Sequence, residues 1–254
     1  DPLHWTGRDQ NWNFMCAACH STGVRKNYDA ARDEYGTEWA EINVACEACH
    51  GPGSAHVTWA RTSRGAESGT DASSLGLVVD LRAAGPGQWH MAEGQDIALK
   101  VGGAPAEGAM DTCFACHSRR QPLIEPATPG DRFLDNALPM LLEPGLYHVD
   151  GQILDEAFEY GSFLQSRMYQ AGVTCTNCHE PHSLRLRAEG NALCAQCHRR
   201  TAYDTVEHTR HASGSDGSRC VDCHMPSKTY MQVDVRHDHG FRIPRPDLTI
   251  AYGV

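Results

Sequence analysis

The pattern of hydrophobic and polar residues predicts few regular elements in this chain. The stretch LDEAFEYGSFLQSRMYQA, residues 154–171, predicts a helix with Gly172 as its C-cap. The apolar run LGLVVDL, residues 75–81, predicts one strand. No apolar run approaches the ~18 residues that a membrane-spanning helix needs. The expected fold class is therefore mainly α, with much irregular coil and little sheet.

Glycine, alanine and proline interrupt the rest of the chain. Residues 60–110 are predicted to be a Gly/Ala-rich insertion of loops and short turns, and residues 121–146, with five prolines, an extended surface connector. The tail FRIPRPDLTI, residues 241–250, is expected to be extended as well. No period of 20 to 50 residues repeats. We expect a single domain over residues 1–254, with a short helix at each cysteine motif.

All twelve cysteines fall into six copies of the pattern Cys-x-x-Cys-His. The cysteine pairs are Cys16 and Cys19, Cys46 and Cys49, Cys113 and Cys116, Cys175 and Cys178, Cys194 and Cys197, and Cys220 and Cys223. The histidines that follow them are His20, His50, His117, His179, His198 and His224. Cysteine pairs also bind zinc or form redox-active disulfides, but neither requires a histidine directly after the second cysteine. From composition alone, six such coincidences have a probability on the order of 10⁻⁸.

The pattern therefore predicts six haem c groups attached to the chain. Residues i, i+3 and i+4 share one face of a helical turn. The two thiols can form thioethers with one haem edge, and the imidazole can bind the iron as proximal ligand. The chain has about 42 residues per haem, too few for a large side-chain core around each one. We expect six stacked haems to form much of the core, in line with a hydrophobic fraction of 41%.

The sequence also offers a distal ligand for every iron. Nine histidines lie outside the motifs: His4, His56, His90, His148, His182, His208, His211, His237 and His239. All six irons can then be bis-histidine, with methionine as the alternative distal ligand. His182 follows the fourth motif closely, and we expect it to serve a neighbouring haem rather than its own.

The net charge, the first residue and the attachment chemistry indicate which partners and which compartment to expect. The net charge of −10 disfavours binding to nucleic acid. The chain begins with Asp1 rather than Met and shows no signal peptide, so we expect a mature, trimmed or partial chain. Thioether attachment of haem takes place outside the cytoplasmic membrane, which predicts a periplasmic or extracellular protein.

Several blocks of the sequence resemble successive parts of a bacterial multihaem cytochrome c family. They include DPLHWTGRDQNWNFMCAACHST, INVACEACHGPGSAHV, LYHVDGQILDE, GSFLQSRMYQAGVTCTNCHEPHSL and DHGFRIPRPDL. The likeness fails mainly in residues 60–110. Members of the family are often fused to tetratricopeptide repeats, and hydroxylamine oxidoreductase and pentahaem nitrite reductase are more distant relatives. Members typically have one more haem site on either side of these blocks, so the resemblance implies a six-haem segment of such a protein.

The resemblance sharpens the choice of distal ligands. The histidines inside the family-like blocks are His4, His56, His148, His182, His211 and His239, one for each iron. His208 is the alternative to His211, and His90 and His237 rank lowest. The sequence leaves open which histidine serves which iron.

Two classes of function follow. The chain has enough histidines to give every iron a second protein ligand, which favours an electron carrier over an enzyme. The expected partners are other redox proteins or extracellular acceptors, and no catalytic residues are expected. A subunit of an extracellular cytochrome filament, a homopolymer, is a version of this function. The alternative is an enzyme that acts on a small nitrogen or sulfur compound at one open haem. No motif has the Cys-x-x-Cys-Lys form of the nitrite-reductase kind, which counts against the enzyme. The residues that could line a substrate pocket are Tyr160, Tyr169, Tyr230 and Arg236.

Overall fold

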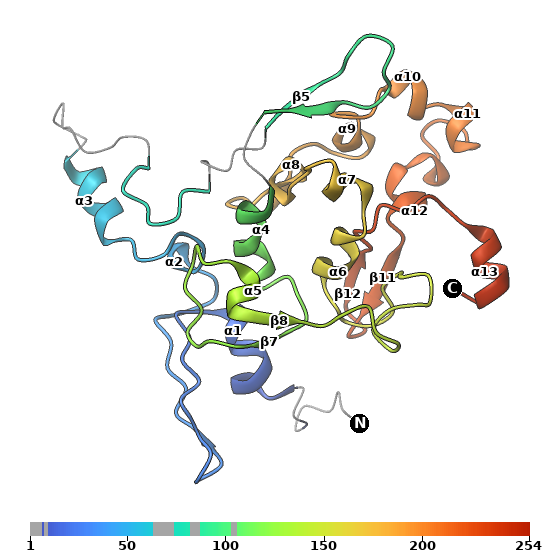
Figure 1. Cartoon of the computed structure of the whole chain (residues 1–254). Helices are drawn as coiled ribbons and strands as arrows, with labels where there is room; N and C mark the ends of the chain where they lie inside the picture. Colours follow the sequence, from blue (N-terminus) through green and yellow to red (C-terminus); the bar gives the residue numbers. More distant parts are fainter. Residues whose placement is uncertain (1–6, 8–9, 63–73, 82–86, 103–105) are drawn as a thin grey trace. The chain divides into compact units, whose positions relative to one another are not determined.

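The computed structural model, drawn in Figure 1, describes residues 7, 10–62, 74–81, 87–102 and 106–254. The chain divides into two compact units. Unit 1 comprises residues 1–84, 107–116 and 120–139, and unit 2 comprises residues 85–106, 117–119 and 140–254. A single domain over residues 1–254 stays a prediction.

Unit 1 is built from short elements. Its helices are the π-helix η2 (Trp12–Cys16), α1 (Ala17–His20), α2 (Cys46–His50), α3 (Ser54–Thr62), α4 (Ala106–Phe114, which begins one residue before the unit) and α5 (Phe133–Asn136). Its strands are β1 (Ser21–Thr22), β2 (Tyr28–Asp29), β3 (Glu34–Tyr35), β4 (Glu41–Ile42), β7 (Arg120–Pro122) and β8 (Ala137–Pro139). The described strands pair antiparallel as β1–β4, β2–β3 and β7–β8. The rings of Phe114 and Phe133, both buried, lie 6.0 Å apart and join α4 to α5.

Unit 2 has the same character. Its helices are α6 (Glu159–Leu164), α7 (Arg167–Gln170), α8 (Cys175–Cys178), α9 (Asn191–Cys194), α10 (Arg200–Tyr203), α11 (Val206–Thr209), the 3₁₀-helix η3 (Asp216–Ser218), α12 (Cys220–His224) and α13 (Pro246–Tyr252). Its strands are β5 (Gln88–His90), β6 (Leu99–Val101), β9 (His179–Glu180), β10 (Arg185–Leu186), β11 (Ser227–Tyr230) and β12 (Asp234–His237). The described strands pair antiparallel as β5–β6, β9–β10 and β11–β12. Short helices with small strand pairs and much coil confirm the broad fold class expected from the sequence.

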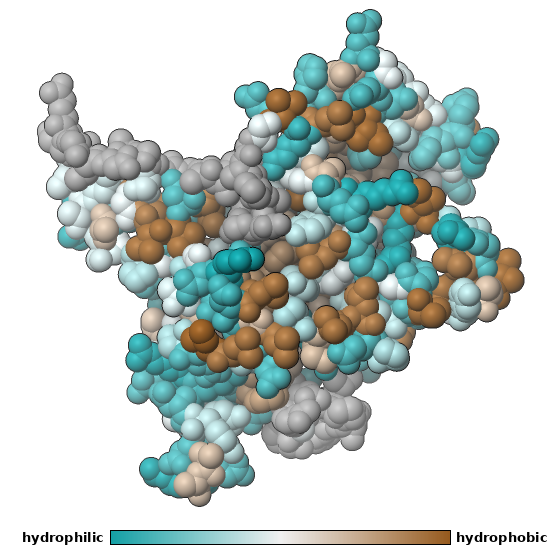
Figure 2. Space-filling view, in the orientation of Figure 1, coloured by the Kyte–Doolittle hydropathy of each residue, from teal (hydrophilic) through white to brown (hydrophobic). Residues whose placement is uncertain are grey.

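The side-chain core is small for a chain of this length. Among the described residues only ten hydrophobic side chains are buried, whereas 28 large hydrophobic side chains are exposed. Figure 2 shows such apolar groups spread over the face in view. A soluble chain rarely leaves so many large apolar groups without cover, so these surfaces fit a protein that packs against a large apolar group.

Two predicted elements are wrong or incomplete. Residues 75–81 form turns instead of a strand, because Leu75 and Gly76 have positive φ angles of 54° and 70°. The predicted helix over 154–171 is divided into α6 and α7. Phe158, with φ of 60°, delays the start of α6, and the Ser166 hydroxyl accepts the Tyr169 N–H and caps a new helix. Gly172, with φ of 87°, ends α7 as predicted.

Three regions predicted to be irregular contain regular structure. The described part of 60–110 includes the β5–β6 hairpin and α4, and the connector 121–146 contains α5 and most of the β7–β8 hairpin. Phe133 and Ala137 anchor this connector by burial. The tail forms α13, which starts at Pro246, because proline is well suited to the first turn of a helix.

Candidate haem attachment and iron-ligand sites

Each Cys-x-x-Cys-His motif lies in a short helix or at the end of one. In α2 and α12 the helix holds the whole motif, from the first cysteine to the histidine. In α8 the helix holds both cysteines, and His179 already has an extended backbone. A capping box between Thr174 and Asn177 starts this helix, and the Asn177 side chain accepts the Thr174 N–H at 2.7 Å. The predicted short helices at the motifs are therefore confirmed.

None of the twelve cysteines, all of which lie in the described ranges, forms a disulfide, and each is at least partly exposed. Over residues 7, 10–62, 74–81, 87–102 and 106–254, no three or more His, Cys, Asp or Glu side chains converge as a metal site. Accessible cysteine side chains at i and i+3 suit thioether attachment.

Cysteines of different motifs lie beside one another within each unit. In unit 1 the Cys19 thiol donates to the main-chain oxygen of Cys116 at 3.7 Å. In unit 2 the thiols of Cys194 and Cys220 are hydrogen-bonded to each other. The first and third motifs are therefore neighbours, and so are the fifth and sixth.

Further neighbours follow from the environment of the other thiols. Burial, together with the nearby Cys113, raises the pKa of Cys49. Burial, together with Cys197, raises the pKa of Cys178. The second motif thus lies near the third in unit 1, and the fourth lies near the fifth in unit 2.

Arg120 places a positive charge beside the contact between Cys19 and Cys116. Its Nη1 lies 3.5 Å from the Cys19 sulfur. A hydrogen bond between the side chains of Cys19 and Cys116, helped by the Arg120 charge, lowers the pKa of Cys19. A thiol with a low pKa is a good nucleophile for bond formation.

Three of the motif histidines, His50, His117 and His224, have an acceptor at Nδ1. Nδ1 of His50 lies 2.9 Å from Val79 O, and Nδ1 of His224 lies 2.7 Å from Arg242 O. Nδ1 of His117 lies 3.0 Å from a carboxylate oxygen of Glu159. A histidine that binds a metal usually donates its second ring N–H in this way, which fixes the ring and leaves Nε2 for the metal.

Two motif histidines each lie near a second histidine, with ring centres about as far apart as those of two imidazoles bound to one metal. The ring centres of His179 and His239 lie 6.3 Å apart with an interplanar angle of 29°. Those of His224 and His208 lie 6.1 Å apart with an angle of 13°. Two imidazoles on opposite sides of one metal, with bonds of about 2.0 Å and about 1.2 Å from nitrogen to ring centre, have centres about 6.4 Å apart.

The other candidate distal ligands are placed as follows. Nδ1 of His56 lies 2.8 Å from Leu75 O, and Nδ1 of His237 lies 2.7 Å from Met225 O. His182 is well exposed, and its Nδ1 lies 3.3 Å from Glu180. His148 is half-buried, and His90 and His211 are exposed. His4 lies outside the described residues.

A large cavity beside Cys223 tests whether this unit can hold a haem. It has a volume of about 660 Å³, and its lining includes Arg167, Arg242 and Arg245. Arg242 donates from Nη1 to Asp150 O at 2.9 Å, yet its buried Nε has no hydrogen-bond partner among the described residues. A guanidinium with a buried donor to spare fits a propionate group. Arg242 was not predicted from the sequence, because it lies in the tail and belongs to no motif.

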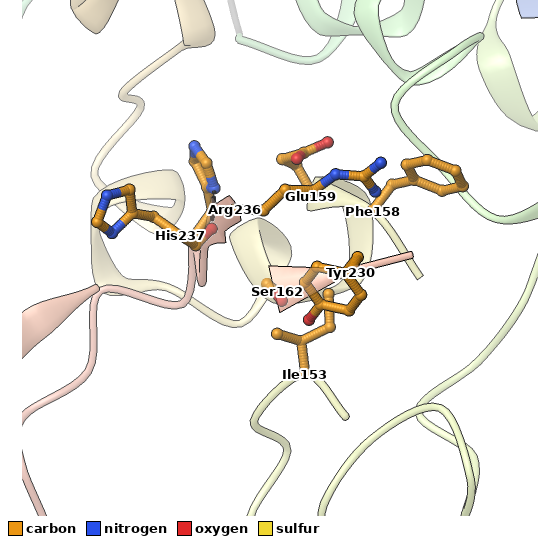
Figure 3. A pocket seen from close by; sticks show the side chains of 8 residues that line it. Ile153, Phe158, Glu159, Ser162, Tyr230, Arg236 and His237 are labelled. Atoms are coloured by element: carbon orange, nitrogen blue, oxygen red, sulfur yellow. Dashed lines mark hydrogen bonds between the residues drawn. The ribbon is translucent and has the colours of Figure 1, made fainter. Parts of the chain in front are cut away.

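Two of the four residues proposed for a substrate pocket line a small cavity (Figure 3). Tyr230 and Arg236 contribute to it from β11 and β12, and Glu159 and Ser162 from α6. Tyr160 and Tyr169 are not among its lining residues. The cavity volume is about 10 Å³, which is room for about one water molecule.

Comparisons with known proteins agree with this picture. The family model described as "Doubled CXXCH motif" matches residues 168–203, and "Cytochrome c554 and c-prime" matches residues 5–51. These two segments contain four of the six motifs. No curated protein sequence matches the chain.

One solved structure is similar over nearly the whole chain. It is the crystal structure of the outer cell wall cytochrome OcwA, with a TM-score of 0.58 and 18% sequence identity. The match covers 95% of this chain but 58% of the OcwA chain, so this chain spans a little over half of that protein. The likeness concerns the fold. Fusion to tetratricopeptide repeats and kinship with hydroxylamine oxidoreductase and nitrite reductase stay predictions. The matched segments carry the haem c attachment motifs of multihaem c-type cytochromes, and the chain shares its fold with a solved cytochrome.

Proposed function

We propose that this chain holds a haem c group at each of its six motifs and transfers electrons among them and to redox partners. The observation that carries the proposal is the pairing of two motif histidines with second histidines at 6.1 and 6.3 Å. An iron bound on both sides by imidazole has no free position for a substrate. Such an iron is suited to gaining and losing an electron without other chemistry.

The same pairs support a proposal for two of the distal ligands. His239 is the distal ligand at the fourth motif, and His208 is the distal ligand at the sixth, in place of His211. For the remaining irons the candidates are still His4, His56, His148 and His182, with His211, His90 and His237 as alternates.

The chain's own residues bind, orient and space the cofactors. When bound, each haem supplies a one-electron iron couple. The cysteine pairs fix each macrocycle, and the main-chain acceptors at Nδ1 of His50 and His224 hold the ligand rings. Contacts between cysteines of different motifs, such as Cys194 with Cys220, keep the attachment points close within each unit. Close attachment points favour fast electron transfer between neighbouring sites.

A count of haems together with their spin state tests the proposal. A pyridine haemochrome assay and native mass spectrometry should give six haems per chain. Electron paramagnetic resonance of the oxidised protein should then show low-spin ferric haem throughout. A lower count contradicts the assignment of haem to every motif. A large high-spin population contradicts the proposal that every iron has two protein ligands.

The alternative function is a redox enzyme with one open haem. The cavity lined by Tyr230 and Arg236 holds about 10 Å³, less than nitrite or hydroxylamine would need. Arg236 is also already paired, with Glu156 at 3.0 Å and with Asp234 at 2.6 Å. These features favour an electron carrier. Steady-state turnover of nitrite or hydroxylamine by the purified protein would overturn that preference.

The proposal includes a location and an assembly. OcwA is described as an outer cell wall cytochrome, and haem attachment to cysteine pairs takes place outside the cytoplasmic membrane. Both support a periplasmic or extracellular site for this chain. No helix of the described ranges is long and apolar enough to cross a membrane. Assembly into a filament remains a prediction, which negative-stain microscopy at high protein concentration tests directly.

A further inference from the structure

The histidine of the third motif differs from other motif histidines in what holds it. Nδ1 of His117 lies 3.0 Å from a carboxylate oxygen of Glu159, whereas His50 and His224 use main-chain oxygens. The Tyr160 N–H also donates to His117 O at 3.1 Å. The start of α6 is therefore bound to the third motif through both a side chain and the main chain.

Glu159 is placed to remain a carboxylate. Its side chain is 26% exposed and lines the small cavity of Figure 3. A glutamate side chain is ordinarily ionised at neutral pH. This one is largely shielded from solvent, where a charge acts strongly on its neighbours.

The nearby cation does not neutralise this carboxylate. Arg236 lines the same cavity, but it is bound to Glu156 and to Asp234. Its guanidinium is also held between two rings, at 5.1 Å from Phe158 and 5.4 Å from Tyr230. Arg236 is therefore balanced by two other carboxylates, and the charge of Glu159 is directed at His117.

We propose that Glu159 is a positioning residue that lowers the reduction potential of the iron bound by His117. The inference deepens the proposed function, since it rests on a haem at the third motif. By accepting the Nδ1–H, the carboxylate makes the imidazole a more basic ligand. A more basic ligand and a nearby negative charge both stabilise Fe(III), which carries one more positive charge than Fe(II).

Glu159 also acts on the fourth motif, although less. His239, whose ring lies near that of His179, lines the same small cavity as Glu159. These two histidines are the pair that faces each other at 6.3 Å. The third and fourth irons therefore share one negative group, with the hydrogen-bonded third iron affected most.

The test is an equilibrium redox titration of the holoprotein and of Glu159→Gln, followed by optical spectra. Glutamine can still accept the Nδ1–H, so the variant removes the charge and keeps the contact. At the potential where the third haem is half reduced in the wild type, we expect a rise of about tenfold in its ratio of reduced to oxidised iron. This corresponds to an upward shift of about 59 mV for about one sixth of the absorbance change. A purely structural role for Glu159 would leave the titration unchanged.

Glu189→Gln is the matched control, because it removes the same charge from an exposed side chain of unit 2. It should leave every midpoint in place. Haem count and spin state are measured on each protein. Six low-spin haems with an unshifted titration in Glu159→Gln overturn this inference alone, whereas missing haems in the wild type overturn the proposed function. If Glu159→Gln loses a haem, the same redox titration is carried out on Glu159→Asp. Its shorter side chain moves the carboxylate away from Nδ1 of His117. An upward shift in one sixth of that titration supports the inference, and an unchanged curve refutes it.

Discussion

Removal of the His239 imidazole is the sharpest test of the ligand assignment. Its ring centre lies 6.3 Å from that of His179, against about 6.4 Å for two imidazoles bound to opposite sides of one iron. The His239→Ala variant would leave the iron of the fourth motif with its proximal ligand and an open or water-filled position. Because the other five irons keep both ligands, about one haem in six should change spin state.

The assay is quantitative electron paramagnetic resonance of the oxidised protein. The integrated high-spin ferric signal should rise from near zero to about one haem per chain, while a pyridine haemochrome assay still gives six. His90→Ala is the control, since this histidine is exposed in β5 and ranks lowest as a ligand. If His239→Ala keeps six haems that are all low-spin, His239 is not an iron ligand and the reasoning from ring separation fails.

Three further outcomes are expected. His208→Ala should produce about one high-spin haem and His211→Ala none by the same assay, and the reverse result would restore His211 as the distal ligand. Gly161→Ala should lower the free energy of unfolding by about 1–2 kcal/mol in denaturant titrations. A Cβ at this position would meet the buried ring of Tyr147, whose Cζ would lie 2.9 Å away. The gain of ~1 kcal/mol in helix propensity does not offset that clash. Equal or greater stability of the variant would show that the ring moves aside freely. Burial, with the nearby Asp238, raises the pKa of Tyr230 to about 12. The contribution of the neutral Tyr230 hydroxyl to folding stability is therefore complete below pH 10 and is lost as the pH rises towards 12. Relative to Tyr230→Phe, the wild type should lose about 2–3 kcal/mol over this range, and parallel curves for the two proteins would rule out this contribution.

The limits of sequence reasoning are visible in particular elements. The strand expected at residues 75–81 depends on an apolar run, but positive φ angles at Leu75 and Gly76 turn the chain there. A Cβ on Gly76 would lie 2.8 Å from Ala55 O, so the backbone of this turn packs directly against α3. Likewise, the break between α6 and α7 depends on the backbone angle of Phe158 and on a cap from Ser166. Apolar periodicity carries no information on such local conformations.

The sequence by itself determined the attachment chemistry of this protein. Two thiols and an imidazole within five consecutive residues fit one helical turn, so local geometry alone brings them to one haem edge. Only the tertiary structure decided what faces each imidazole and what holds it. His239 and His208 reach their partners from other segments, and the Glu159 carboxylate meets His117 across 42 positions of the chain. Contacts between distant segments depend on how the chain packs, which the spacing of residues along the sequence does not encode.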